Sequence, residues 1–274
     1  MSTLLFLIAC GPSGETVYRP NPSRGDSGAF DTGAELNTDS GGDPGGEEPG
    51  GEDTGALGES GPCPTGMLAV AGQFCVDAFE ASLEERVDGE WRAASPYETV
   101  YDREVRAVVA DGIEPQGYIS GAQAAEACEA AGKRLCTSEE WLEACRGPDG
   151  STWPYGDSYR SGACNDSYGG GHPVTDYFGT SDGVWDGEHM NDPGINQQPG
   201  TVAAGGAYAD CISDWGAYDM HGNLHEWVSD SDGTFRGGFY ADGSINGSGC
   251  GYATTAHSSG YHDYSTGFRC CSDL

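Results

Sequence analysis

Two histidines and two carboxylates stand close together between Asp219 and Trp227, in the segment DMHGNLHEW, and such side chains can ligate a metal ion. His221 and His225 are four residues apart, a spacing that brings two imidazoles onto one face only in a helix. Gly222 and the asparagine after it interrupt a helix, and on a strand the two rings would lie too far apart to share one ion. The segment therefore predicts a turn leading into a buried strand.

A second group of nitrogen and oxygen ligands follows, made of His257, His262 and Asp263, and His225 could join it. No recognised metal-ligand spacing connects these residues. We therefore interpret them as surface side chains of a Tyr-rich loop.

The C-terminal segment, residues 235–274, is rich in Gly and Ser and has no helical period. Arg236-Gly237-Gly238 predicts a strand entering a tight turn, because Gly tolerates positive φ. Gly267-Phe268-Arg269-Cys270 predicts a closing strand that ends in a disulfide. A segment this irregular needs covalent bonds or metal ions to hold one shape.

The composition restricts the class of partner. The chain has 274 residues, 46 glycines and a formal charge of −32, so a nucleic-acid backbone would be repelled. The acidity suits hard divalent cations such as calcium, which take oxygen ligands. Eleven cysteines predict an oxidising compartment.

The elements expected before the folded domain are an export signal and a spacer. Residues 1–10 end in Leu7-Ile8-Ala9-Cys10, which resembles a bacterial lipobox and predicts lipid attachment at Cys10. Residues 11–62 form an acidic, Gly-rich segment that cannot bury enough apolar surface to fold, so we expect a disordered tether. We therefore expect an exported protein that is held at the outer membrane or cell surface by its N-terminal lipid, with its folded domain over residues 63–274.

Within this domain, local signals predict two short helices and few strands. Ser120 opens a capping box and an Ala-rich helix that ends before Gly132, and Thr137 opens a second one that ends at Gly147. A strand is expected over residues 74–81, and the long polar stretch 148–206 needs anchors of its own.

Four motifs in register resemble the formylglycine-generating enzymes, the sulfatase-modifying factor family. They are Gly132-Lys133-Arg134-Leu135 with Thr137-Ser138-Glu139-Glu140-Trp141, then Gly222-Asn223-Leu224-His225-Glu226-Trp227, then Arg236-Gly237-Gly238, and last Gly267-Phe268-Arg269-Cys270. The resemblance runs from about Cys63 to the C-terminus. It implies an α+β fold with little regular secondary structure, related to the C-type-lectin-like fold and rich in disulfides.

The resemblance also implies two disulfides, Cys128 with Cys270 and Cys145 with Cys250. For the remaining cysteines we expect the pairs Cys63–Cys75, which would flank a hairpin, Cys164–Cys211 and Cys136–Cys271. Each would restrict the unfolded chain.

Calcium is the metal that the resemblance implies. One site would use the side chains of Asp219 and Glu226 with the carbonyls of Gly222 and Leu224. A second site would use Asn165, the carbonyl of Asp166 and a further acid, for which we choose Asp192. Several loop carbonyls and carboxylates would supply the six to eight oxygens that Ca²⁺ prefers. The competing interpretation is that Asp219 and Glu226 only cap turns.

Catalysis in this family uses two cysteines after the Arg-Gly-Gly motif, which bind copper(I) and oxidise a substrate cysteine to formylglycine. Here the first cysteine position falls on Asp242 and the motif serine on Phe239, while Cys250 matches a structural cysteine. A carboxylate cannot replace a thiolate for copper(I), so we expect neither copper binding nor this activity. An active metal-dependent oxidase, of copper or non-haem iron, remains the alternative.

The expected role is therefore a calcium-stabilised binding or structural module for a protein or glycan that the sequence does not name. Aromatic side chains offer contact area and a polar tip for such a ligand. Candidates for a groove are the tryptophans and Tyr240, Tyr252, Tyr261 and Tyr264.

Overall fold

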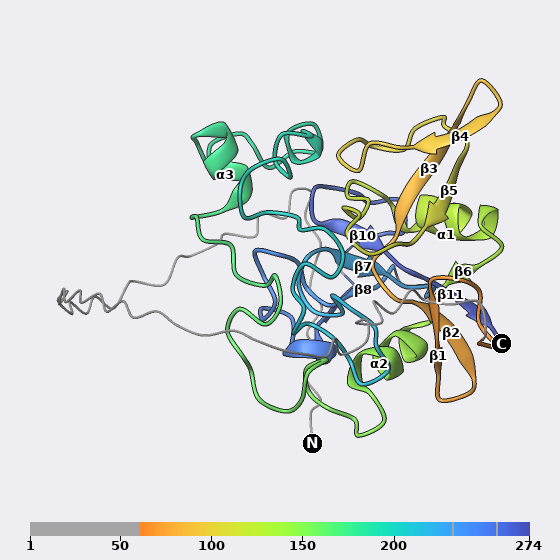
Figure 1. Cartoon of the computed structure of the whole chain (residues 1–274). Coiled ribbons are helices and arrows are strands. Elements are labelled where there is room, and N and C mark those ends of the chain that lie inside the picture. The colour runs from red at the N-terminus through yellow and green to blue at the C-terminus, as the bar shows by residue number, and fades with distance from the viewer. Residues whose placement is uncertain (1–60, 232, 256) are drawn as a thin grey trace, which may run out of the picture. The chain divides into compact units, whose positions relative to one another are not determined.

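Short strands tied together by cysteines make up the domain, in a computed structural model that describes residues 61–274 apart from 232 and 256 (Figure 1). The expected lipid-attachment residue Cys10 and the tether up to residue 60 lie outside the described residues. Among the residues described, no helix is long and apolar enough to cross a membrane.

One four-stranded sheet joins the two ends of the domain. The hairpin of β1 (Met67–Val70) and β2 (Phe74–Asp77) pairs with β11 (Cys270–Asp273), which pairs in turn with β6 (Arg134–Leu135). Figure 1 shows the C-terminus beside this hairpin. The strand expected over residues 74–81 is shorter, because β2 ends at Asp77 and the chain bends at Ala78 and Phe79.

Two further sheets lie beside it. The first has the order β10 (Thr266–Phe268), β7 (His225–Trp227), β8 (Phe235–Arg236) and β9 (Ala253–Thr254), with β10 and β7 parallel. The second has the order β4 (Glu90–Ala93), β3 (Ser82–Val87) and β5 (Val105–Val108). The predicted turn into a buried strand is β7, whose three residues are all buried.

Both predicted helices are present with their capping boxes. They are α1 (Gly121–Ala130), with Ser120 at its N-cap, and α2 (Ser138–Arg146), with Thr137 at its N-cap. Each cap side chain accepts the N–H three residues on, and the Gln or Glu there returns a bond to the cap N–H.

The long polar stretch adds helical turns that the sequence pattern does not predict. A third helix, α3 (Pro173–Phe178), and a 3-10 turn over His189–Asn191 lie in it, and a second 3-10 turn spans Gly249–Gly251. These segments are too short for a hydrophobic period to identify them.

The structure has five disulfides, and all five join the cysteines that we expected to pair. They are Cys63–Cys75, Cys128–Cys270, Cys136–Cys271, Cys145–Cys250 and Cys164–Cys211. Four of them join residues at least 47 apart in sequence. Cys128–Cys270 joins α1 to β11, and Cys145–Cys250 joins α2 to the turn over Gly249–Gly251.

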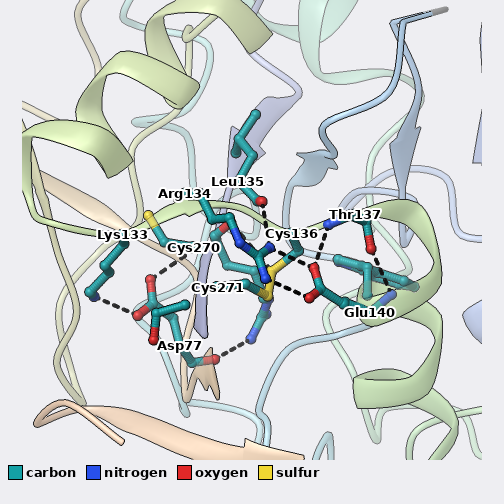
Figure 2. The surroundings of a disulfide bond; sticks show 12 residues. Asp77, Lys133, Arg134, Leu135, Cys136, Thr137, Glu140, Cys270 and Cys271 are labelled. Carbon is teal, nitrogen blue, oxygen red and sulfur yellow. Dashed lines mark hydrogen bonds and ion pairs between the residues drawn. A yellow bond between two sulfur atoms is a disulfide. The ribbon is translucent and has the colours of Figure 1, made fainter. Parts of the chain in front are cut away.

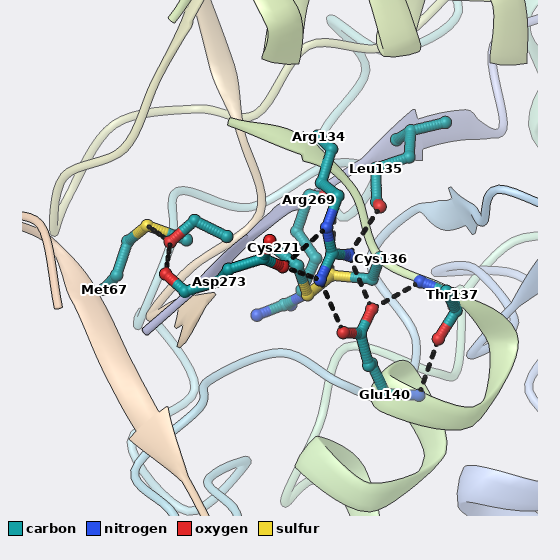
Figure 3. Close-up of polar contacts among 10 residues, drawn as sticks. Met67, Arg134, Leu135, Cys136, Thr137, Glu140, Arg269, Cys271 and Asp273 are labelled. Carbon is teal, nitrogen blue, oxygen red and sulfur yellow. Dashed lines mark hydrogen bonds and ion pairs between the residues drawn. A yellow bond between two sulfur atoms is a disulfide. The ribbon is translucent and has the colours of Figure 1, made fainter. Parts of the chain in front are cut away.

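The charged residues after Gly132 hold α2 and the hairpin onto β11. Lys133 Nζ lies 2.6 Å from the Asp77 carboxylate, which also accepts the N–H of Cys270 at 2.9 Å (Figure 2). Arg134 donates two 2.7 Å bonds to Glu140 of α2 and one of 2.9 Å to Asp273 (Figure 3). This motif therefore has a structural role where α2, the β1–β2 hairpin and β11 meet.

A candidate pocket beside the C-terminal loop

A buried arginine organises the centre of the domain. Arg269 has no exposed surface and donates two hydrogen bonds to the Glu226 carboxylate, at 2.6 and 2.7 Å. Its guanidinium also donates to the carbonyls of Asp77 and Tyr218. Trp141 of α2 donates its indole N–H to the same Glu226 carboxylate at 2.7 Å. Three family motifs thus meet in one hydrogen-bonded cluster, because a buried ion pair needs every donor and acceptor satisfied.

Further buried carboxylates surround this ion pair. Glu80 accepts the side-chain N–H of Asn223 and the backbone N–H of Leu224, and Asp219 accepts the N–H of Gly206. Burial, and after it the charges of Glu226 and Asp219, raises the pKa of Glu80 well above its usual range. Burial likewise raises the pKa of Asp219 to about 6, against the Gly206 hydrogen bond and the charge of Arg269.

The atoms expected at the first calcium site are engaged by nitrogen donors. The Glu226 oxygens accept three N–H groups from Arg269 and Trp141, and one Asp219 oxygen accepts Gly206. As arranged here they do not form an oxygen cage, and the described residues contain no group of three or more His, Cys, Asp or Glu side chains placed to hold a metal. Calcium binding therefore stays a prediction.

The residues chosen for the second calcium site have separate surroundings. Asn165 donates to the carbonyl of Thr201 and to the side-chain oxygen of Asn223. The Asp166 carboxylate contacts a histidine, described below. The Asp192 side chain accepts the N–H of Gly194, and the Asp192 backbone carbonyl accepts the hydroxyl of Tyr118.

The positions of the family's reactive residues hold a closed turn. Phe239 and Asp242 bond to each other through both backbone pairs, and Phe239 is packed among aromatic rings. The Asp242 carboxylate accepts the N–H groups of Ser244 and Ile245 and the hydroxyl of Tyr252. All ten cysteines of the described residues are in disulfides, so this part of the chain holds no thiol.

The tyrosines expected to line a groove are mostly core residues. Tyr240, Tyr252 and Tyr264 are at most 4% exposed, and only Tyr261 is half-buried. This expectation was wrong because the segment packs its rings inward, where Tyr240 and Tyr264 form a cluster with Phe239.

The C-terminal histidines also have separate partners. His225 is buried against the rings of Phe235, Phe239 and Tyr252. His262 hydrogen-bonds Asn191 and Tyr101, and Asp263 bonds Tyr261 and Ser265. His257 stacks on Tyr261 with ring centroids 3.7 Å apart. The expectation that these are surface side chains was wrong for His225 and Asp263, which are 5% and 4% exposed because the segment packs them inward.

A pocket of about 340 Å³ opens beside the turn at Asp242. Its polar floor is a pair that the sequence did not predict, in which His221 Nε2 lies 3.2 Å from the Asp166 carboxylate. The two side chains are 1% and 4% exposed. The remaining lining residues are Trp153, Tyr159, Gly243, Ser244 and Ser248. A larger hollow of about 490 Å³ lies beside Arg134, where the arginine is already paired with Glu140.

The glycines and asparagine of the central motif bring the pair together. A Cβ at Gly222 would meet the Asn165 carbonyl oxygen at 2.2 Å, so only glycine admits this close approach. Asn223 accepts the Asn165 side-chain N–H and donates its own backbone N–H to the Asn165 carbonyl. The sequence pattern contained Asn223 but gave no sign that Asp166, far away in the long loop, would reach His221.

The described residues thus form an α+β domain with little regular secondary structure, five disulfides and a pocket beside its C-terminal loop. The profile of the sulfatase-modifying factor enzyme 1-like domain matches residues 71–274. The chain therefore belongs to the sulfatase-modifying factor enzyme 1-like family.

The solved structures to which the chain is similar are distant from it in sequence. Major Tropism Determinant I1 variant is 17% identical with a TM-score of 0.45, over 77% of this chain and 53% of that chain. PvdO from Pseudomonas aeruginosa is 16% identical with a TM-score of 0.46, over 73% and 80%. CarF is 17% identical with a TM-score of 0.38, over 60% and 69%. The matched region is thus about half of the tropism determinant, and no curated protein matches the chain.

Proposed function

We propose that this domain is a binding module that keeps the scaffold of the formylglycine-generating family without its copper chemistry. The observation that carries the proposal is the pairing of all ten described cysteines. Copper(I) is a soft ion that selects thiolates, and a disulfide sulfur is not a thiolate. The carboxylate of Asp242, which stands at the first reactive position, is a hard ligand and already accepts three hydrogen bonds.

The test is a thiol and copper measurement on the non-reduced protein. When the non-reduced protein is denatured, we expect no cysteine of residues 61–274 to react with a thiol-specific disulfide reagent. We also expect the protein to retain no copper(I) in the presence of a chromogenic copper(I) chelator. A peptide containing the CxPxR motif should remain unmodified by mass. Conversion of its cysteine to formylglycine would refute the proposal and establish the oxidase alternative.

We further propose that the protein works outside the cytoplasm. Five disulfides support this, because such bonds persist in oxidising compartments. Lipid attachment at Cys10 stays a prediction, which metabolic labelling with a fatty acid and a Cys10→Ser control would test. Label that is retained in the variant would contradict it.

A further inference from the structure

We propose that the pocket beside the C-terminal loop binds a cationic amine whose N–H groups reach His221 and Asp166; this names the ligand class of the proposed binding module and rests on that function. The two side chains form the pocket floor with the surrounding protein packed closely against them. A Cβ at Gly243 would lie 2.8 Å from His221 Cε1 and 3.2 Å from Asp166 Cβ, so the glycine makes room for the pair.

The position of the proton on the His221 ring decides which hydrogen-bonding atom of the pair has no partner. An ionised carboxylate can only accept, so the His221 Nε2 atom facing Asp166 must carry the proton. In the neutral ring the other nitrogen, Nδ1, is then an acceptor. This Nδ1 is buried and has no hydrogen-bond partner among the described residues. Because buried polar atoms are almost always paired, Nδ1 calls for a donor from outside the chain.

The charge of the floor is also uncompensated. Among the described residues, the Asp166 side chain receives hydrogen bonds only from the His221 ring and, at 3.4 Å, from the Tyr159 hydroxyl. A buried carboxylate is stabilised by an opposite charge. A protonated amine supplies both the missing charge and a donor for Nδ1, whereas a sugar hydroxyl supplies only the donor.

The walls favour the same ligand class. Trp153 and Tyr159 lie with ring centroids 6.1 Å apart at the pocket, and an aromatic face attracts a cation within about 6 Å. Ser244 and Ser248 also line the pocket, and a serine hydroxyl can accept a hydrogen bond. The chain's formal charge of −32 draws cations to the protein and repels anions.

The test is calorimetry at pH 8 on the whole protein with n-butylammonium, tetramethylammonium and methyl glucoside, all with a chelator present. We expect saturable binding of n-butylammonium, at least about tenfold tighter than of tetramethylammonium, which has no N–H donor. Equal binding of the two ammonium ions, tighter binding of the glucoside, or no binding of n-butylammonium would each overturn the proposal.

Variants locate the site. Asp166→Asn keeps the side-chain shape and should weaken n-butylammonium binding about tenfold, and Gly243→Ala should weaken it by displacing the pair. Glu129→Gln, on the exposed face of α1, removes the same charge elsewhere and should change the affinity less than about twofold. Circular dichroism checks that each variant is folded; an Asp166→Asn protein that is folded and binds normally would overturn the assignment.

Two arms separate the sources of the amine. A lysine capped at both backbone ends that binds at least as tightly as n-butylammonium indicates a protein side chain, and weaker binding indicates a free amine. Both results support the ligand class. Failure here is distinguishable from failure of the proposed function, because the thiol and copper measurements do not involve this pocket.

Discussion

Replacing Glu226 with Gln should strongly destabilise the domain. The change leaves the guanidinium of Arg269, which has no exposed surface, without its paired carboxylate. Breaking a buried ion pair by removing one partner costs about 3–5 kcal/mol. Two carbonyls still accept from Arg269, and the nearby charges of Glu80 and Asp219 also act on it, so we expect a loss near the lower end, about 3 kcal/mol.

Urea unfolding of the disulfide-intact protein, followed by tryptophan fluorescence, measures this loss. The matched control is Glu129→Gln, an exposed carboxylate whose removal should change the free energy of unfolding by less than about 0.5 kcal/mol. Trp141→Phe removes one hydrogen bond to the same carboxylate and should cost about 1–2 kcal/mol.

Unfolding measured with and without calcium distinguishes an ion-pair role of Glu226 from a calcium-ligand role. If Glu226 is the partner of Arg269, the loss in Glu226→Gln is the same in calcium as in chelator. If Glu226 is instead a calcium ligand, wild type is stabilised by calcium, the variant is not, and the loss appears mainly in calcium buffer. A loss under about 1 kcal/mol in both buffers would refute the ion-pair reasoning altogether.

Three further predictions concern the backbone, the disulfides and pH. Gly222→Ala should cost more than about 3 kcal/mol because its Cβ would strike a backbone oxygen, whereas Gly132→Ala, with a similar positive φ but open space, should cost about 1 kcal/mol; thermal unfolding compares them. Removing both disulfides made by Cys270 and Cys271 should cost about 1 kcal/mol more than the sum of the single removals, because each bond alone keeps the long loop closed; additive urea midpoints would contradict this. Burial, with a smaller effect of a neighbouring histidine, lowers the pKa of His225 to about 3, so the unfolded chain takes up a proton below about pH 6.5 that the folded protein refuses. The stability of wild type relative to His225→Phe should therefore fall by about 2.3 kcal/mol between pH 6.5 and 4.5, and a constant difference would show that His225 is accessible to protons.

The sequence by itself determined the features that are local or covalent. The capping boxes at Ser120 and Thr137 set the starts of α1 and α2, since a cap involves only residues three apart. The order of the motifs identified the family and, through it, two disulfides. The sequence also showed that position 242 holds a carboxylate and not a thiol, because the type of metal ligand is a property of the residue itself.

Only the tertiary structure decided which distant side chains share a site. Arg269 and Glu226 were both visible as motif residues, but their pairing depends on how β10, β11 and β7 lie together. The Asp166–His221 pair joins residues 55 apart, and it forms because Gly222 lets the long loop approach the central turn. The tyrosines likewise turned inward because the C-terminal segment closes over the core. Such contacts depend on how distant segments pack together, and the spacing of residues along the chain does not predict that packing.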